Sequence, residues 1–448
     1  MKTLIHNATI FTNTGTTPVL TAHTLVIDGA RIAEILPESE ARQKHPRAAI
    51  IDAGGRLLMP GLINAHMHFY STFARGLAPP VRPRNFAEVL RLLWWKLDAS
   101  LDEEAVYYST LLAAASAVKH GVTAVIDHHA SPNAIAGSLD CIEEALALVG
   151  MRGVLCYEIT DRNGRAGAQA GLRENERYLH KCRHANNEST EHLFDAMVGL
   201  HASFTVADDT LQAATALSRA YHAGCHVHVL EDPVDQEETR ARHGRAVVDR
   251  LQSFGILGPQ TLAAHCIHLA EQDRDILAHT QTLVAHNPQS NMNNAVGRAD
   301  IFRLLERGVT VGIGTDGMSA ALWPDLRTAI LLHKHDLRDC NAGWREIQHM
   351  ALRGNPAIFQ HLTGKRVGEI APGSLADLIL IDYYPATTLT PENFWGHLLY
   401  GLAEAAVDTT IINGKVVVRN GRLLQLDERE LAAAARPVAQ RVWQRFYE

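Results

Sequence analysis

The hydrophobic positions in the middle of the chain fall into short runs separated by longer amphipathic stretches. Longer segments with helical periodicity, such as 103–119, 208–222 and 325–337, lie between the runs. About eight strand and helix units in this order predict a (β/α)₈ TIM barrel. The apolar runs, each of strand length, lie near 61–66, 122–127, 153–159, 196–201, 225–230, 261–265, 282–286 and 309–314.

The two ends of the chain carry a different pattern, in which short β-runs alternate with tight turns. Asp28-Gly29 is a hairpin signal near the start, and Asn413-Gly414 and Asn420-Gly421 interrupt the β-runs near the end. We therefore expect both ends to meet in one small β-sandwich. The predicted units are a composite sandwich of residues 1–58 and 365–430, a barrel of residues 59–364 and a C-terminal helix of residues 431–448.

Composition excludes several classes of protein. The chain has 46% hydrophobic and 20% charged residues and a net charge of -7, without the Lys and Arg clusters that nucleic-acid binding requires. Six scattered cysteines without C-x-x-C favour reduced thiols. The N-terminus shows no signal-peptide pattern, and no run is long enough to span a membrane. We expect a cytoplasmic protein that acts on a small molecule, with no nucleic-acid or membrane partner, as a homo-oligomer (dimer or tetramer).

Histidine is the outlier, with 25 residues. Chemistry in a (β/α)₈ barrel takes place at the C-terminal ends of the strands, so residues that follow the apolar runs are the candidates. This position holds an unusual number of imidazoles and carboxylates: His66, His68, Asp127, His128, His129, His201, His226, His228, Glu231, His265, His268, His286 and Asp316.

A metal site is predicted from four of these residues. His66 and His68 share one side of a strand, because residues i and i+2 point the same way, and together they can bind one ion. His228 and Asp316 complete the expected ligand set. Imidazole with carboxylate suits Zn²⁺ or Fe²⁺, so we expect one divalent metal, with Zn²⁺ preferred. The fourth strand ends in His201 and offers no lysine whose carbamate could bridge two ions.

Other roles stay open for three of these residues. His226 shares a strand face with His228, and we prefer a place for it behind a ligand or in the substrate wall. Asp316 could be a buried capping residue instead of a ligand. Glu231 could be an exposed loop carboxylate, because Asp232 and Pro233 open a charged segment.

Short motifs recur along nearly the whole chain. They are Pro60-Gly61 with His66-X-His68, Arg75-Gly76, His228-X-X-Glu231, Ala264-His265-Cys266, Asn287-Pro288-X-Ser290-Asn291, Gly314-Thr315-Asp316 and Pro372-Gly373-Ser374-Leu375-Ala376-Asp377-Leu378. Together they resemble the amidohydrolase superfamily, in its cytosine deaminase-like and chlorohydrolase-like branch. The stretches 156–164 and 286–297 resemble SsnA-type aminohydrolases. Many relatives carry Glu-X-X-X-X-Gly before the second strand, where this chain has Ser116 to Gly121.

The resemblance implies hydrolytic deamination of a purine-, pterin- or pyrimidine-like N-heterocycle through a metal-bound hydroxide. Asp316, assisted by His265, would take a proton from the water, and Glu231 would protonate the ring nitrogen. The expected substrate contacts are His129, Glu158, Asp161, His201 and Asn287.

Three alternatives remain. The same site could hydrolyse a cyclic amide and open a ring, because the attack chemistry is shared and the fold does not decide the substrate. Gly312-X-Gly314-X-X-Gly317 formally matches a dinucleotide-binding turn, but it follows the last strand, and Asp316 would repel a pyrophosphate. A non-catalytic metal-binding protein would have no need of Glu231 and His265 beside the metal.

Overall fold

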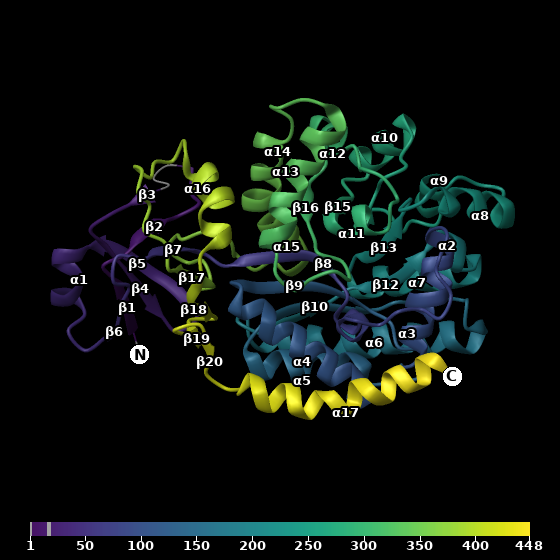
Figure 1. Ribbon diagram of the computed structural model, residues 1–448, viewed down its shortest axis with the longest axis horizontal. Coiled ribbons are helices and arrows are strands. Elements are labelled where there is room, and N and C mark those ends of the chain that lie inside the picture. Colours follow the sequence, from purple (N-terminus) through teal and green to yellow (C-terminus); the bar gives the residue numbers. More distant parts are fainter. Residues whose placement is uncertain (1, 16–18) are drawn as a thin grey trace.

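A closed barrel forms the centre of the molecule. The computed structural model describes residues 2–15 and 19–448. Two parallel groups of strands are joined by the bridges between Met67 and Asp316 and between Ile159 and Leu200. This confirms the predicted (β/α)₈ barrel (Figure 1). Its strands are β8 (Leu62–Met67), β9 (Val122–His129), β10 (Arg152–Tyr157), β11 (Phe194–Ala196) with β12 (Val198–Ala202), β13 (Cys225–Val229), β14 (Leu262–His265), β15 (Leu283–His286) and β16 (Val311–Ile313).

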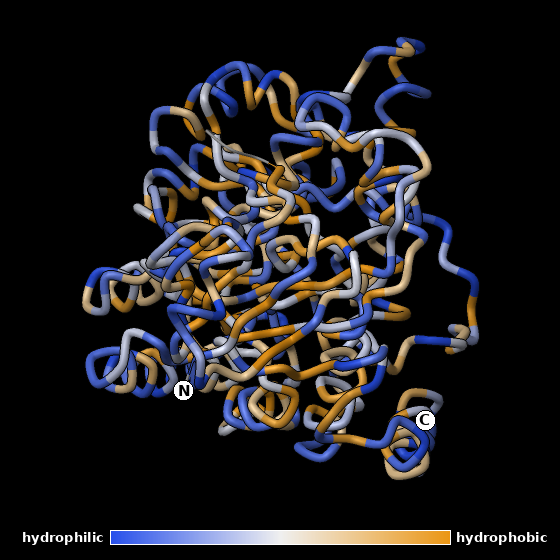
Figure 2. Tube along the Cα trace, turned by 90° about the vertical axis from the view of Figure 1, so that its left-hand side faces the viewer, coloured by the Kyte–Doolittle hydropathy of each residue, from blue (hydrophilic) through white to orange (hydrophobic). Residues whose placement is uncertain are grey.

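Helices surround the barrel because each buries one apolar side against the strands. In α5 (Ser138–Val149), Leu139, Ile142 and Leu146 are buried, and the helix ends at Gly150 in the left-handed conformation. The barrel strands themselves are buried on both faces. Figure 2 accordingly shows hydrophobic segments running through the interior and hydrophilic segments toward the periphery. Other surrounding helices are α4 (Glu103–Lys119), α6 (Gly164–Glu188), α7 (Asp208–Tyr221) and α13 (Trp323–Leu337).

Both ends of the chain contribute to one β-structure beside the barrel. β17 (Leu378–Ile381) pairs antiparallel with β7 (Leu57–Pro60), which joins the C-terminal strands to the N-terminal ones in a seven-stranded sheet. A second sheet has the order β5-β4-β1-β6, from β5 (Arg31–Pro37), β4 (His23–Asp28), β1 (Lys2–His6) and β6 (Ala49–Asp52). This confirms the predicted sandwich, while the unit boundaries given above stay a prediction.

The long connection after β8 lies across one end of the barrel. It forms η1 (Phe69–Ala74), α2 (Phe86–Val89), η2 (Leu90–Trp94) and α3 (Trp95–Ala99). The C-terminal helix α17 (Glu428–Tyr447) runs beneath α4 and reaches this segment (Figure 1). There Trp443 Nε1 donates to the Phe73 carbonyl at 2.8 Å and the Tyr447 hydroxyl donates to the Ala78 carbonyl at 2.9 Å. Among the described residues, no helix combines the length and the apolar character of a membrane span.

Candidate metal centre and active site

The two histidines at the end of β8 each use one ring nitrogen as an anchor and direct the other inward. His66 Nδ1 lies 2.8 Å from His226 Nε2, and His66 Nε2 lies 3.6 Å from Asp316 Oδ1. His68 Nδ1 lies 2.5 Å from the His128 carbonyl oxygen, and His68 Nε2 lies 3.0 Å from Asp316 Oδ1. Both inward nitrogens therefore converge on the same oxygen of Asp316.

His228 and Asp316 complete the cluster from β13 and from the end of β16. His228 Nδ1 lies 2.9 Å from the His201 carbonyl oxygen, and its Nε2 lies 3.3 Å from His68 Nε2. Asp316 has a left-handed backbone, with φ of 52°, and its Oδ2 accepts a hydrogen bond from Ser290 Oγ at 2.5 Å. All four predicted metal ligands thus lie together.

Close packing of β8 against β16 sets this geometry. Asn64 Nδ2 donates to Thr315 Oγ1 at 2.8 Å, while the Thr315 backbone N–H donates to Asn64 Oδ1 at 3.2 Å. Gly314 has no room for a side chain, because a Cβ there would lie 2.5 Å from Asn287 Oδ1 and 2.6 Å from the His66 carbonyl oxygen. The Gly314-Thr315-Asp316 motif therefore lets Asp316 approach His66.

These residues fit a divalent metal ion. His66 Nε2 is buried and has no hydrogen-bond partner among the described residues, as expected of a nitrogen shaped to bind an ion. Burial lowers the pKa of His66 to about 3 and that of His228 well below its ordinary value, which keeps both imidazoles neutral. Against the effect of burial, the hydrogen bond with Asp316 raises the pKa of His68 to about 9. His68 therefore holds a proton whose positive charge balances Asp316. A bound metal ion would take the place of that proton.

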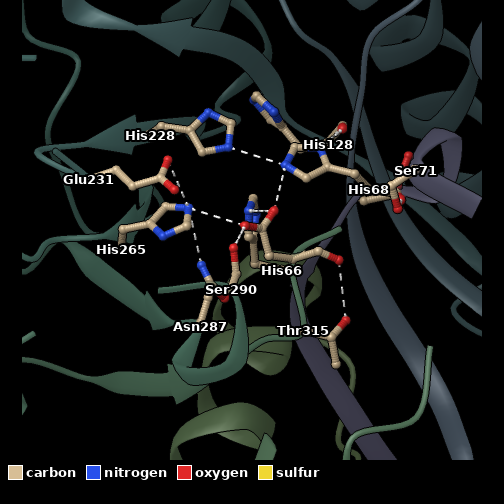
Figure 3. Close-up of polar contacts among 12 residues, drawn as sticks. His66, His68, Ser71, His128, His228, Glu231, His265, Asn287, Ser290 and Thr315 are labelled. Atoms are coloured by element: carbon tan, nitrogen blue, oxygen red, sulfur yellow. Dashed lines mark hydrogen bonds and ion pairs between the residues drawn. The ribbon is translucent and has the colours of Figure 1, made fainter. Parts of the chain in front are cut away.

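Glu231 and His265 lie beside the four ligands. Glu231 Oε2 lies 3.5 Å from His265 Nε2, and Glu231 Oε1 accepts from Asn294 Nδ2 at 3.4 Å. His265 Nε2 lies 3.7 Å from Asp316 Oδ2, and its Nδ1 lies 2.9 Å from Asn291 Oδ1. Burial, and then the charge of Asp316, raises the pKa of Glu231 well above its ordinary value. A carboxyl group that tends to keep its proton therefore lies next to the metal donors, where Figure 3 shows it beside His265 and His228.

The cluster opens into a pocket with about 600 Å³ of empty space, its mouth included. Its polar side contains Glu231, Asp316, His68 and His228. An aromatic wall beside a few polar groups suits a flat heterocyclic ligand. The apolar side of the pocket consists of Tyr70, Phe86, Leu90, Trp94, Trp95 and Phe204.

Two of the five expected substrate contacts line this pocket, Glu158 and His201. Burial opposes ionisation of Glu158, but His201, His128 and Arg162 together hold its pKa well below the ordinary value. Glu158 therefore faces the pocket as a carboxylate.

The other three expected contacts lie elsewhere. Asp161 accepts hydrogen bonds from the Ala207 backbone N–H at 2.7 Å and from Thr210 Oγ1 at 3.1 Å, at the start of α7. His129 is buried, with Nε2 2.9 Å from Ser131 Oγ. Asn287 is buried behind His265, with its Nδ2 3.5 Å from His265 Nε2.

The sequence analysis did not predict several residues of the pocket. Trp94 and Trp95 belong to the connection after β8, and a pair of tryptophans there is the one feature that could have indicated a binding wall. Asn294 and Asp235 act through Glu231, since Asp235 Oδ2 accepts from the Glu231 backbone N–H at 3.0 Å. His226 lies behind His66, in the supporting position that we preferred for it.

Known proteins resemble this chain over nearly its whole length. A match to the amidohydrolase family covers residues 57–417. The 5'-deoxyadenosine deaminase of Methanosarcina mazei is 31% identical, over 98% of this chain and 97% of its own length. The 5-methylthioadenosine/S-adenosylhomocysteine deaminase of Pelotomaculum thermopropionicum is 33% identical, over 98% of each chain. Among solved structures, an adenosine deaminase from Xanthomonas campestris with bound zinc has a TM-score of 0.82 at 24% identity, covering 99% of this chain and 98% of that one.

Proposed function

The chain belongs to the amidohydrolase family, and from this premise we propose that it is a metal-dependent aminohydrolase that releases ammonia from an amino group on an N-heterocycle. Two curated relatives that match almost end to end are named as deaminases of adenine nucleosides. The substrate is a purine-, pterin- or pyrimidine-like small molecule that fits between the aromatic wall and the histidine cluster. The expected homo-oligomer and cytoplasmic location stay predictions.

His66, His68, His228 and Asp316 would hold one divalent metal ion. Three imidazole nitrogens and one carboxylate oxygen form a ligand set suited to Zn²⁺, which we propose in preference to Fe²⁺. The zinc bound in the Xanthomonas campestris deaminase supports the same choice. When bound, such an ion polarises a water molecule and lowers its pKa toward neutrality.

Proton transfer depends on three residues of this chain. Asp316 Oδ2 and His265 Nε2, 3.7 Å apart, stand where they can take the proton of the attacking water. Glu231 then donates its proton to the ring nitrogen next to the attacked carbon, which makes that carbon accept the oxygen. The proton held by Asp316 passes to the amine, which leaves as ammonia, and Glu231 takes up the remaining proton of the water as the carbonyl forms, so that it is protonated again. The observation that carries the proposal is the Glu231 carboxyl group held 3.5 Å from His265 beside the metal donors.

A substrate screen tests this function. The zinc-loaded protein is incubated with aminopurines, aminopterins, aminopyrimidines and their cyclic-amide counterparts, and two products are measured separately, free ammonia and ring-opened acid. We expect ammonia with the ring intact. Ring opening without ammonia would show a cyclic amidohydrolase instead, and neither product from any compound would overturn the proposal.

A further inference from the structure

Glu158 is a buried carboxylate in the pocket, and none of the proton transfers above uses it. Glu158 directly follows β10, and Glu231 follows β13. In the barrel, β12 lies between these two strands. One carboxylate oxygen of Glu158 and one ring nitrogen each of His201 and His228 lie within 4.8 Å of one another. Because His228 is a metal donor, Glu158 stands close enough to the reacting centre to contact the heterocycle itself rather than a distant substituent.

Neighbouring side chains fix both the position and the charge of Glu158. His128 Nδ1 lies 3.3 Å from its Oε2, and Arg162 Nη2 lies 3.8 Å from its Oε1. Arg162 also pairs with buried Asp98, and its guanidinium lies 5.1 Å from the centre of the Trp95 ring. A cation held in this way keeps its neighbouring carboxylate ionised and oriented.

An ionised carboxylate only accepts hydrogen bonds, which restricts the ring edge that it can face. In a 6-aminopurine nucleoside the free ring nitrogens are acceptors, and the one donor of the base is the amine that leaves. An amino-oxo ring such as guanine or pterin adds a ring N–H beside its carbonyl. A carboxylate that faces an unprotonated ring nitrogen puts two acceptors together without a proton between them, which is unfavourable. Sites built around a substrate N–H therefore discriminate against analogues that lack it by roughly 10⁴-fold in kcat/KM.

The lining of the pocket also selects on charge. Its carboxyl side chains are Glu158, Glu231, Asp235 and Asp316. Within the described ranges of the chain, no Lys or Arg side chain lines it. A phosphate or carboxylate on the substrate would therefore find no Lys or Arg partner in the lining, and a neutral ring is favoured.

We infer that the substrate is a neutral amino-oxo heterocycle whose ring N–H donates to Glu158, and that adenine nucleosides and nucleotides are poor substrates. Glu158 is then the residue that determines specificity, and Arg162 is a positioning residue that acts through it. The inference rests on the proposed deamination and narrows its substrate class. It separates this chain from its curated relatives, which are named for adenine nucleosides.

Matched substrates test the inference on the zinc-loaded full chain. Guanine and 2-aminopurine carry the amine on the same carbon and differ in the oxo group and its ring N–H; pterin and adenosine complete the panel. We expect guanine or pterin to exceed both 2-aminopurine and adenosine in kcat/KM by roughly 10⁴-fold. An equal or higher kcat/KM for adenosine or 2-aminopurine would overturn the inference and leave the deaminase function standing.

Variants separate recognition from the intrinsic reactivity of the substrates. The preference in kcat/KM between two substrates is measured in the variant and in the unchanged protein, and intrinsic reactivity cancels when the two preferences are compared. Glu158→Gln should lower kcat/KM on the better oxo substrate roughly 10- to 100-fold and leave 2-aminopurine nearly unchanged. Arg162→Met should shift the same ratio less. Glu176→Gln, an exposed carboxylate on α6, is the matched control and should shift neither value. An unchanged ratio in Glu158→Gln would contradict the assignment.

Binding of xanthine, an unreactive ring with lactam N–H groups, gives a readout that needs no turnover. Calorimetry should show xanthine binding that Glu158→Gln weakens by a similar factor. If no compound releases ammonia but xanthine binds in this Glu158-dependent way, the reaction is wrong and the recognition stands. Xanthine binding that Glu158→Gln leaves unchanged would overturn the recognition.

Discussion

The histidine cluster and the aromatic wall of the same pocket are built differently. The cluster stands on the ends of β8, β13, β14 and β16, where strand pairing and bonds such as Asn64 to Thr315 fix each donor. The wall comes from the connection after β8 and from short helices such as α3, which α17 holds from outside. Chemistry therefore rests on the rigid frame, while stacking against the ring rests on segments that can change without disturbing that frame.

The largest effect should come from removing a metal donor. His228→Ala should lose both the bound metal and all activity above background, because one of the four proposed ligands is gone. Elemental analysis and ammonia release measure the two losses. His268→Ala is the matched control, since its exposed imidazole bonds the Val296 carbonyl outside the cluster. Full metal content in His228→Ala would remove His228 from the ligand set.

A smaller loss separates proton transfer from metal binding. Glu231→Gln keeps the size of the side chain and removes its transferable proton, so turnover should fall by about 10² to 10⁴ with the metal retained. Because burial raises the pKa of Glu231 well above its ordinary value, activity should be lost as the pH rises through that pKa. The variant should lack this alkaline decline. Near-normal turnover would show that another group donates the proton.

The aromatic wall should affect affinity more than chemistry. Trp95→Ala should raise KM roughly 5- to 150-fold, the range for losing one stacking partner of a base, with metal content unchanged. Steady-state kinetics on the best substrate measure this, and Trp95→Phe should recover most of the loss. A fall in metal content would show that the wall and the cluster are not separable.

The smallest effect should come from Asp161, whose carboxylate supports the start of α7 rather than the pocket. Asp161→Ala should cost about 1 kcal/mol of unfolding free energy, as for a lost helix cap. Urea unfolding measures this cost, and kcat/KM should stay near that of the unchanged protein. A large drop in kcat/KM without loss of stability would return Asp161 to the substrate site.

The difference between the two regions also explains what the sequence could predict. His66 and Asp316 follow apolar runs, and the barrel gathers whatever stands at such strand ends, so their meeting could be expected. Glu158 and Asp161 are both carboxylates after one strand, and only the packed structure shows that one faces the pocket and the other bonds to the start of α7. Trp95 reaches the pocket from the connection after β8, and the pattern of hydrophobic positions does not predict the path of that connection.

Anomalous diffraction from crystals of the zinc-loaded protein tests the central claim most directly. We expect one ion, with the inward ring nitrogens of His66, His68 and His228 at about 2.0–2.1 Å and an Asp316 oxygen at a similar distance. Glu231 should stand near the ion without binding it. A second ion held by Glu158 and His201, or a Glu231 oxygen within bonding distance, would contradict a mononuclear centre with a separate proton donor.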